Sequence, residues 1–571
     1  MTRGPVTLER LSLATGVLTC VVALVVFSTT LVFIYEGRVE GPYSDFWYFV
    51  KQLHRLHDGR GDWWSEWTRP FNAHQIAIPR LFFWAEVELF STRNVFLVAA
   101  SCLFQLVTPL LFLICISQVQ PRLATPTRLF LCGTAFALPF AATQLQNFLT
   151  PWHMAFLACF AFASLSFFAM TQVRSFTGTT YGRALLGLSV VAAVTASYSM
   201  GAGLLTWPIL LAMAALVRLG ARALLMVGVT GVLVITTYLG ASSAGSGVNT
   251  AAVNSSTLLW ILACLGSPLS IQNLTAGQGL AAGGLLLAAW NVVGVALRPK
   301  AQSPATLLAS ALIVFAVGAT FLTGIGRAQG WPDMWGAARY NTATLLFWLS
   351  LIVLVSLRAD ETDRAASATR LVVQSVVLLW LVAVLLPAHF ANGIRLVGKM
   401  ERVRGANVAL LMDVRARREY RQILTPGLAR QPRDAIQPLR NLLEEKGIGI
   451  FSYGHHRLLG TPIRNAHRTA DPSSCAGTLE RRSAAGDMVR LDGRVKNRKS
   501  TAPVEFIFVT DEAETIRGIG RTTERRSPFL HLGRPRGAGL AWRAYVPTAE
   551  AEGMQIWALL PDGAVCPFGR G

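Results

Sequence analysis

The amino-acid sequence predicts a helical membrane protein of about 11 transmembrane helices, followed by a smaller β-rich domain. Apolar residues make up 52% of the chain and charged residues only 15%, whereas soluble domains contain about 25% charged residues. No acidic residue occurs between Glu88 and Asp333, and a charge at bilayer depth costs several kcal/mol. Beyond residue 450 the pattern changes to short alternating runs separated by Gly, Pro and Asp, which is typical of strands. Together these observations exclude a soluble enzyme, a disordered chain and a fibrous repeat.

The membrane helices are predicted from apolar runs that are long enough to cross a bilayer. The first run, residues 11–35, is too long for the core of a signal peptide and lacks a small-residue cleavage site, so we expect it to remain as a membrane anchor. Ten further runs follow, and the segments 184–217 and 257–275 leave the total open by one or two. The ten runs lie near residues 94–119, 129–147, 153–173, 184–200, 204–217, 223–240, 276–296, 303–324, 341–358 and 371–391.

Loop charge predicts the orientation of these helices. With the N-terminus inside, the short inside loops carry 13 basic residues, while the short outside loops carry two, both in the loop 325–340. The positive-inside rule therefore places the N-terminus inside, and an odd number of spans places everything after residue 391 outside. This tail holds 30 of the 52 Lys and Arg residues and 18 of the 31 acidic residues. It contains no zinc-finger or helix-turn-helix pattern, so its basic excess favours anionic lipids or phosphate-bearing substrates over nucleic acid.

Three regions are expected. Residues 1–391 form the membrane domain, residues 392–450 form a basic helical connector, and residues 451–571 form a small exterior antiparallel domain that resembles a β-sandwich. Six of the eight Cys residues fall in expected membrane helices and indicate apolar packing. The other two, Cys475 and Cys566, are the only pair in the tail. They can form a disulfide if the tail faces an oxidising compartment, but the sequence leaves this open.

The membrane domain includes a long exterior loop, residues 36–93. A helix is expected from Asp45 to His57, with aromatic residues along one side. A second helix begins near Pro79, a residue that suits the first turn. It is too short to span a membrane, so we expect it to lie along the interface with Trp84 and its aromatic neighbours inserted.

The expected spans contain few groups that can carry chemistry. Ion-coupled transporters usually hold Asp, Glu or Lys at mid-membrane, and the long stretch without carboxylates disfavours that class. The same observation does not exclude a channel or a flippase. The sequence contains no P-loop, HExxH or GxSxG motif, which would indicate nucleotide binding, zinc hydrolysis or an activated serine.

The exterior polar residues are therefore the candidates. A carboxylate at the membrane surface, such as Asp45, can act as a general base toward a hydroxyl. Arginine side chains can hold a phosphate at the same level. A base, a phosphate clamp and an apolar trough together suit group transfer from a lipid-linked phosphate. The candidate substrate-binding residues are His74, Arg80, Arg327, Arg339 and Tyr340.

Each candidate also has a structural interpretation. Asp45 begins a helix, where an Asp side chain commonly caps free N–H groups. His74 can be a loop histidine bonded to backbone, and Arg80 and Arg339 can anchor helix ends at headgroups. Arg327 and Arg339 nevertheless lie together in an exterior loop, against the usual charge bias, which favours phosphate contact.

Five segments of the expected membrane domain stand out: GPYSDFWYF after the first helix, FNAHQIAIPRLFFWAEVELF before the second, QLQNFLTPWHMAF, SMGAGLLTWP and GRAQGWPDMWGAARYNTATLLFW. They resemble segments of bacterial members of the glycosyltransferase C superfamily. The resemblance covers roughly residues 1–391. It implies a polyprenyl-phosphate sugar as donor and an acidic residue in the first exterior loop that serves the acceptor or a metal; Asp45 is the matching position. The doubled acidic motif of other members is missing, because Ser44 precedes Asp45 and Phe46 follows it, and this leaves the need for a divalent metal open.

The resemblance thus implies an inverting glycosyltransferase of the cytoplasmic (inner) membrane that works on the exterior face. Its expected partners are the lipid-linked donor, a glycan or lipid acceptor of the cell envelope and membrane lipids, with no nucleic acid. Two alternatives stay open. One is a non-enzymatic glycan translocator or export partner, and the other is a scaffold whose tail binds another protein.

Overall fold

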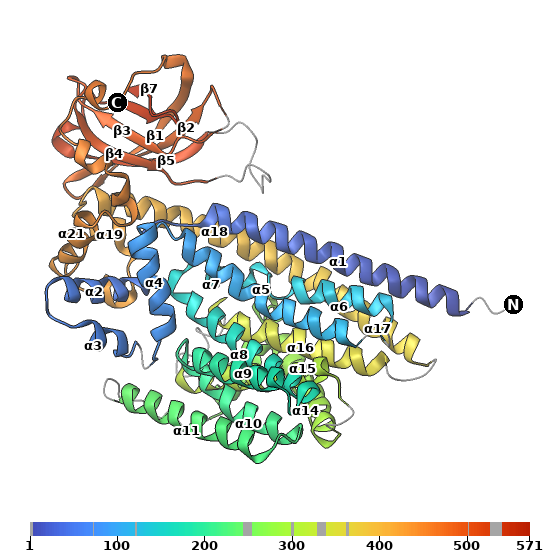
Figure 1. The fold of residues 1–571 in the computed structure, drawn as a ribbon. Helices are drawn as coiled ribbons and strands as arrows, with labels where there is room; N and C mark the ends of the chain where they lie inside the picture. Colours follow the sequence, from blue (N-terminus) through green and yellow to red (C-terminus); the bar gives the residue numbers. More distant parts are fainter. Residues whose placement is uncertain are drawn as a thin grey trace.

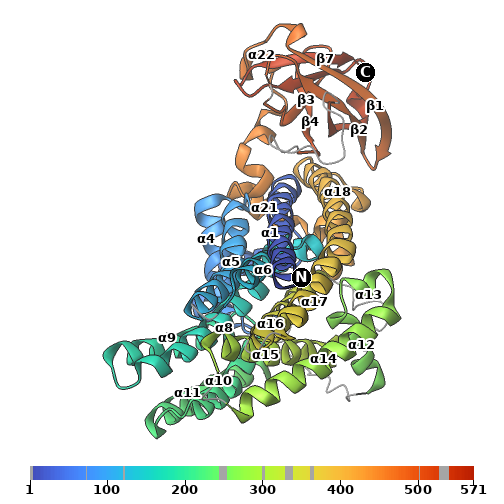
Figure 2. The same ribbon diagram turned by 90° about the vertical axis from the view of Figure 1, so that its right-hand side faces the viewer.

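The computed structural model describes residues 4–71, 74–119, 123–243, 254–298, 302–327, 338–360, 365–500, 502–525 and 539–570. Most of these residues form an elongated bundle of helices, and the C-terminal residues form a sheet that packs beside one end of the bundle (Figure 1). The first and the last long helices, α1 (Gly4–Gly37) and α18 (Leu386–Leu411), lie side by side beneath this sheet (Figure 2).

Ten helices among the described residues are long and apolar enough to cross a membrane, which indicates a multi-pass membrane protein. Large apolar side chains also cover the outside of the bundle; Leu24, Leu286 and Trp290 are 67%, 75% and 77% exposed. Besides α1, the spans are α5 (Val95–Gln118), α6 (Thr125–Ala137) with α7 (Leu145–Leu149), α8 (Met154–Val173), α9 (Thr180–Ser197), α11 (Ala221–Ser243), α14 (Leu274–Leu297), α15 (Pro304–Arg327), α16 (Asn341–Asp360), and α17 (Ala365–Trp380) with α18.

Ten helices of spanning length among the described residues are one fewer than the 11 expected, which lies within the one or two that the sequence leaves open. The run near 204–217 forms a shorter apolar helix, Gly201–Leu216, in which a 3-10 turn leads directly into α10 (Thr206–Leu216). It falls short of the about 20 residues that usually cross a bilayer. Tyr198 at the end of α9 and Tyr238 near the end of α11 have ring centres 6.2 Å apart, so α11 returns the chain to the end of the bundle where α9 stops. Two other short helices, α12 (Ser255–Leu265) and α13 (Leu269–Gln272), lie between α11 and α14.

The loop at residues 36–93, which is expected to be exterior and is called the exterior loop below, contains three helices, α2 (Phe46–His57), α3 (Trp63–Thr68) and α4 (Ala77–Phe90). Both expected helices are present, since α2 follows Asp45 and α4 contains Pro79. In Figure 1, α4 runs across the direction of α1 and α5, as a helix lying along an interface would. Trp84 is exposed on α4, while Phe83 is fully buried on its other side.

The last span does not end at residue 391. A short π-helical stretch, Leu381–Leu385, joins α17 to α18, and α18 continues to Leu411. The expected boundary between membrane domain and connector therefore falls inside a helix. The reason is that apolar side chains recur at helical spacing beyond residue 391, and Val397, Met400 and Val403 are buried. The rest of the connector contains the short helices α19 (Arg417–Tyr420), α20 (Pro426–Ala429) and α21 (Gln437–Glu445), and a further short helix, α22 (Ile463–Ala466), precedes the sheet.

The expected β-sandwich is corrected to one curled sheet of seven antiparallel strands, in the order β1-β2-β5-β4-β3-β6-β7. Both faces are covered. Ile507 and Val509 point into the sheet's own core, while Phe506 and Phe508 join the core shared with the helices. The strands are β1 (Cys475–Ala485), β2 (Met488–Asn497), β3 (Phe506–Thr510), β4 (Ile516–Thr522), β5 (Leu540–Pro547), β6 (Gln555–Leu559) and β7 (Val565–Arg570).

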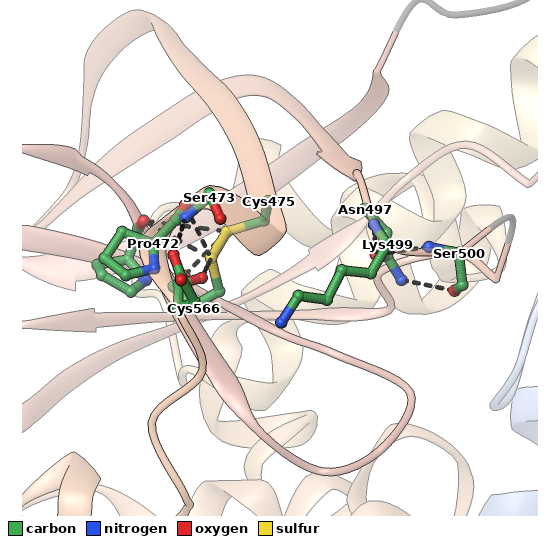
Figure 3. Close-up of a disulfide and its surroundings, with 9 residues drawn as sticks. Pro472, Ser473, Cys475, Asn497, Lys499, Ser500 and Cys566 are labelled. Carbon is green, nitrogen blue, oxygen red and sulfur yellow. Dashed lines mark hydrogen bonds between the residues drawn. A yellow bond between two sulfur atoms is a disulfide. The ribbon is translucent and has the colours of Figure 1, made fainter.

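A disulfide joins the two outer strands of the sheet. Cys475 at the start of β1 bonds to Cys566 on β7, 91 residues later (Figure 3). The pairing that the sequence left open is therefore present. The six other Cys residues are free and lie in helices.

Candidate functional site

The candidate site begins at a fixed turn before α2. Ser44 has a left-handed backbone, with φ of 54°, which is uncommon for a residue other than glycine. Its N–H donates to the carbonyl oxygen of Ile423 at 2.9 Å, and the indole N–H of the buried Trp47 donates to the same oxygen at 2.9 Å. The Ile423 carbonyl, in the connector, therefore fixes one residue before Asp45 and one residue after it.

The carboxylate of Asp45 is half-buried and has no hydrogen bond or direct ion pair to any described residue. In particular, it does not cap the first N–H groups of α2. Burial raises the pKa of Asp45, while the positive charges of Arg339 and Arg327 act to lower it. Asp45 is therefore a carboxylate with unoccupied oxygens in a positive field, which is the state a proton acceptor needs.

Arg339 lies in a short 3-10 turn, Ala338–Tyr340, just before α16. Its guanidinium carbon is 5.0 Å from the centre of the Tyr340 ring, and its carbonyl accepts from the Asn147 amide at 3.3 Å. The Tyr340 ring is buried edge-on to Trp260 at 5.3 Å, and its hydroxyl has no partner among the described residues. Arg327 ends α15 and is exposed.

His74 belongs to the same neighbourhood. Its backbone pairs with Phe71, since its N–H donates to the Phe71 carbonyl at 2.7 Å. Burial, helped by the positive charge of Arg327, lowers the pKa of His74 to about 4. The imidazole is therefore neutral at pH 7 and adds no charge, but it can still accept or donate a hydrogen bond.

Two further groups at this end of the bundle are missing from the sequence-based candidates. His153 is buried beside the start of α8 and lies in the electrostatic field of Arg339 and Lys399; its Nδ1 has no partner among the described residues. Lys399 is exposed on α18, with its ammonium 5.9 Å from the ring centre of Tyr43. No sequence signal indicates Lys399, because it is more than 350 residues from Asp45. His153 lies in the QLQNFLTPWHMAF segment, which offers a weak signal.

Arg80 has a different environment from the other predicted residues. It is buried, and its guanidinium donates to the carbonyl oxygens of Trp67 and Arg69. Burial lowers its pKa to about 10. These contacts hold α3 against α4 and occupy the Arg80 guanidinium. Contact between Arg80 and a phosphate stays a prediction.

A row of aromatic rings leads from the exterior loop toward the bundle. Phe90 stacks on Phe96 at 5.1 Å, Phe96 on Phe82 at 5.8 Å, Phe82 meets Phe104 at 5.4 Å, and Phe104 meets Phe162 at 5.5 Å. The rings come from α4, α5 and α8 and are half-buried or exposed. Phe104 also lines a small cavity between the helices. The residues around this cavity are Phe104, Gln105, Thr108, Pro139, Leu157, Phe160, Ala161, Thr342, Leu345 and Leu346.

The site as described thus contains one carboxylate, two histidines and three cations. Nowhere in the described ranges do three His, Cys, Asp or Glu side chains gather as ligands for a metal ion. The groups present can accept a proton at Asp45 and can attract an anion at Arg327, Arg339 and Lys399.

Comparison of the chain with protein-family models, with curated proteins and with solved structures finds no match.

Proposed function

We propose that this chain is a membrane glycosyltransferase. It transfers a sugar from a polyprenyl-phosphate donor to an envelope glycan or lipid acceptor on the exterior face of the cytoplasmic membrane. The N-terminus lies inside and the tail outside. The observation that carries the proposal is the Asp45 carboxylate, which makes no side-chain bond to a described residue and lies in the field of Arg327 and Arg339, about 280 or more residues away along the chain.

The reaction follows from these groups. Asp45 takes the proton from the acceptor hydroxyl as its oxygen attacks the anomeric carbon, which inverts that centre. The bond between the anomeric carbon and the phosphate oxygen breaks, and polyprenyl phosphate leaves with one more negative charge. Arg327 and Arg339 stabilise that charge as it develops. Polyprenyl phosphate is a competent leaving group without a proton, so one carboxylate suffices.

Two other features support the proposal. The aromatic row from Phe90 to Phe162, on α4, α5 and α8, provides an apolar surface that suits an isoprenoid chain. The disulfide between Cys475 and Cys566 fits a tail in an oxidising exterior compartment.

The experiment uses cells from which the gene is deleted. We expect them to accumulate a lipid-linked sugar, and mass spectrometry of their lipid extract identifies this donor. Wild-type protein should clear it. Asp45→Asn should leave it in place, because removing a general base typically costs about 100-fold or more in rate. Asp58→Asn is the matched control, since Asp58 is an exposed carboxylate of the same loop that pairs with Arg60.

Clearance of the donor by Asp45→Asn at the wild-type rate would remove the proposed base. The non-enzymatic role, as glycan translocator, export partner or scaffold, would then replace the transferase.

A further inference from the structure

The strongest ionic cluster of the described residues lies outside the candidate site, at Glu40. This carboxylate is five residues before Asp45 and only 3% exposed. One of its oxygens, Oε2, accepts from Arg521 Nη1 at 2.5 Å and from the Tyr453 hydroxyl at 2.9 Å. The other, Oε1, accepts from Arg525 Nη2. All three partners belong to the tail, so Glu40 joins the exterior loop to the tail.

Glu40 is ionised in this setting. Burial opposes its ionisation, but the charges and hydrogen bonds of Arg521 and Arg525 outweigh burial and hold the pKa of Glu40 at about 2. The Arg521 guanidinium also lies 5.0 Å from the ring centres of both Tyr453 and Phe506. A buried charge that loses its partners strongly destabilises its surroundings, so Glu40 and the arginines must stay together.

The backbone around Glu40 is fixed as well. The Glu40 carbonyl accepts from the Asn407 amide at 2.6 Å, and the Gly41 N–H donates to the Thr92 carbonyl at 2.8 Å. Gly449, with φ of +64°, packs directly on Gly41; a Cβ at Gly449 would lie 2.7 Å from the Gly41 Cα. No other residue type fits there without displacing the loop.

Residues 40–47 are therefore held at both ends by the part of the chain that follows α18. Arg521, Arg525 and Tyr453 hold Glu40, while the Ile423 carbonyl holds Ser44 and Trp47. Asp45 lies between Ser44 and Trp47, five residues after Glu40, and has no side-chain bond of its own to a described residue. Its position relative to Arg327 and Arg339 depends on these attachments.

We propose that Glu40 is a positioning residue through which the tail fixes Asp45 opposite Arg327 and Arg339. The role of Glu40 in catalysis rests on the proposed function of Asp45. The physical connection between Glu40 and the tail does not depend on that function. The tail then helps to hold the Asp45 carboxylate in place, in addition to any contact that the tail makes with an acceptor.

The test uses full-length protein carrying Asp45→Cys, with iodoacetamide as the probe. Alkylation is measured across a range of pH on the peptide that contains residue 45, so the native thiols do not interfere. Arg327 and Arg339 favour the thiolate at this position. Adding Glu40→Gln should move residue 45 away from them and slow alkylation at pH 7 by about threefold, because the thiolate is the reactive form. Restoring the charge with Glu40→Asp should recover part of the rate.

Glu66→Gln is the matched control. Glu66 is also a buried carboxylate of the exterior loop and pairs with Arg55 and Arg69, but it contacts no residue of the tail among those described. It should leave the alkylation profile unchanged. An unchanged profile with Glu40→Gln, or an equal shift with Glu66→Gln, overturns the proposal. If Glu40→Gln does not fold, Arg521→Lys carries the test, since lysine keeps the charge but loses the planar contacts with Tyr453 and Phe506.

Donor clearance separates the two proposals. If both hold, Glu40→Gln lowers kcat and leaves the KM for the donor near the wild-type value, because the arginines are untouched. If Asp45→Asn clears the donor normally while Glu40→Gln still shifts the alkylation profile, the positioning role stands and the transferase assignment fails.

Discussion

At the scale of single residues, Asp45 and His74 owe their properties to burial beside positive charge. Asp45 has a raised pKa and His74 a pKa of about 4, both with burial as the largest cause. A neutral imidazole and a carboxylate that ionises at higher pH than usual lie together in the field of the same arginine, Arg327. This combination favours proton transfer over a structural ion pair.

The raised pKa of Asp45 predicts a pH dependence. A base works in its ionised form, so kcat should rise with pH as Asp45 loses its proton. Arg339→Gln removes a charge that lowers this pKa, so the rising limb should move to higher pH. The pH profile of transfer, with the donor isolated from the deletion cells, measures this shift.

Arg60→Gln is the control for that profile, because Arg60 is exposed and paired with Asp58. If the rise of kcat with pH occurs at the same pH in Arg339→Gln as in wild type, or shifts equally in Arg60→Gln, its assignment to Asp45 is contradicted.

Asp45 is singled out by its matching position in the resemblance, within the segment GPYSDFWYF, whereas Arg327 and Arg339 are singled out because they run against the positive-inside rule. The sequence does not reveal the ionic contact of Glu40 with the tail, because its partner Arg521 is 481 residues away. Lys399 and His153 are missed for the same reason: only the folded chain brings His153 into the field of both Arg339 and Lys399.

At the scale of secondary structure, α4 packs on the start of α5. Its buried Glu86 accepts from the N–H groups of Asn94 at 2.6 Å and Leu97 at 3.0 Å. These N–H groups lie at the start of α5 and have no partner within that helix. Glu86 therefore caps α5 from a neighbouring helix.

Glu86→Ala should lower the free energy of unfolding by about 1–3 kcal/mol, because it leaves two buried N–H groups without an acceptor. Thermal or denaturant unfolding of the purified protein in detergent measures the loss. Glu88→Ala, an exposed carboxylate on the same helix, should change stability little. Equal losses in the two variants would show that the cap contributes nothing of its own.

Apolar periodicity predicts most of the helices, because a 20-residue apolar run has few alternatives to spanning a bilayer. It places the helix after Asp45 and the helix that contains Pro79 well. It does not show that the run near 204–217 falls short of spanning length, or that the helix of the last run continues to Leu411. Alternation in the tail predicts strands but cannot distinguish a sandwich from one curled sheet, because both bury alternate residues.

At the scale of the whole molecule, the exterior loop and the tail gather at one end of the bundle, while the N-terminus of α1 lies at the other (Figure 1). The contacts of Glu40, Ser44 and Trp47 with the tail join these two regions. The functional end of the proposed enzyme is therefore assembled from residues near positions 45, 74, 153, 330 and 400. Long-range packing of this kind is what a single sequence reveals least.

The most direct test of the account is the binding of a polyprenyl phosphate to purified protein, followed by native mass spectrometry. Arg327→Gln with Arg339→Gln should weaken binding about tenfold or more, since charged hydrogen bonds contribute about 1.5–3 kcal/mol each. Asp45→Asn should bind the lipid phosphate as wild type does while failing to clear the donor. Arg222→Gln with Arg298→Gln, in loops expected inside, is the control pair. Wild-type affinity in the Arg327/Arg339 variant, or an equal loss in the control pair, would contradict the account.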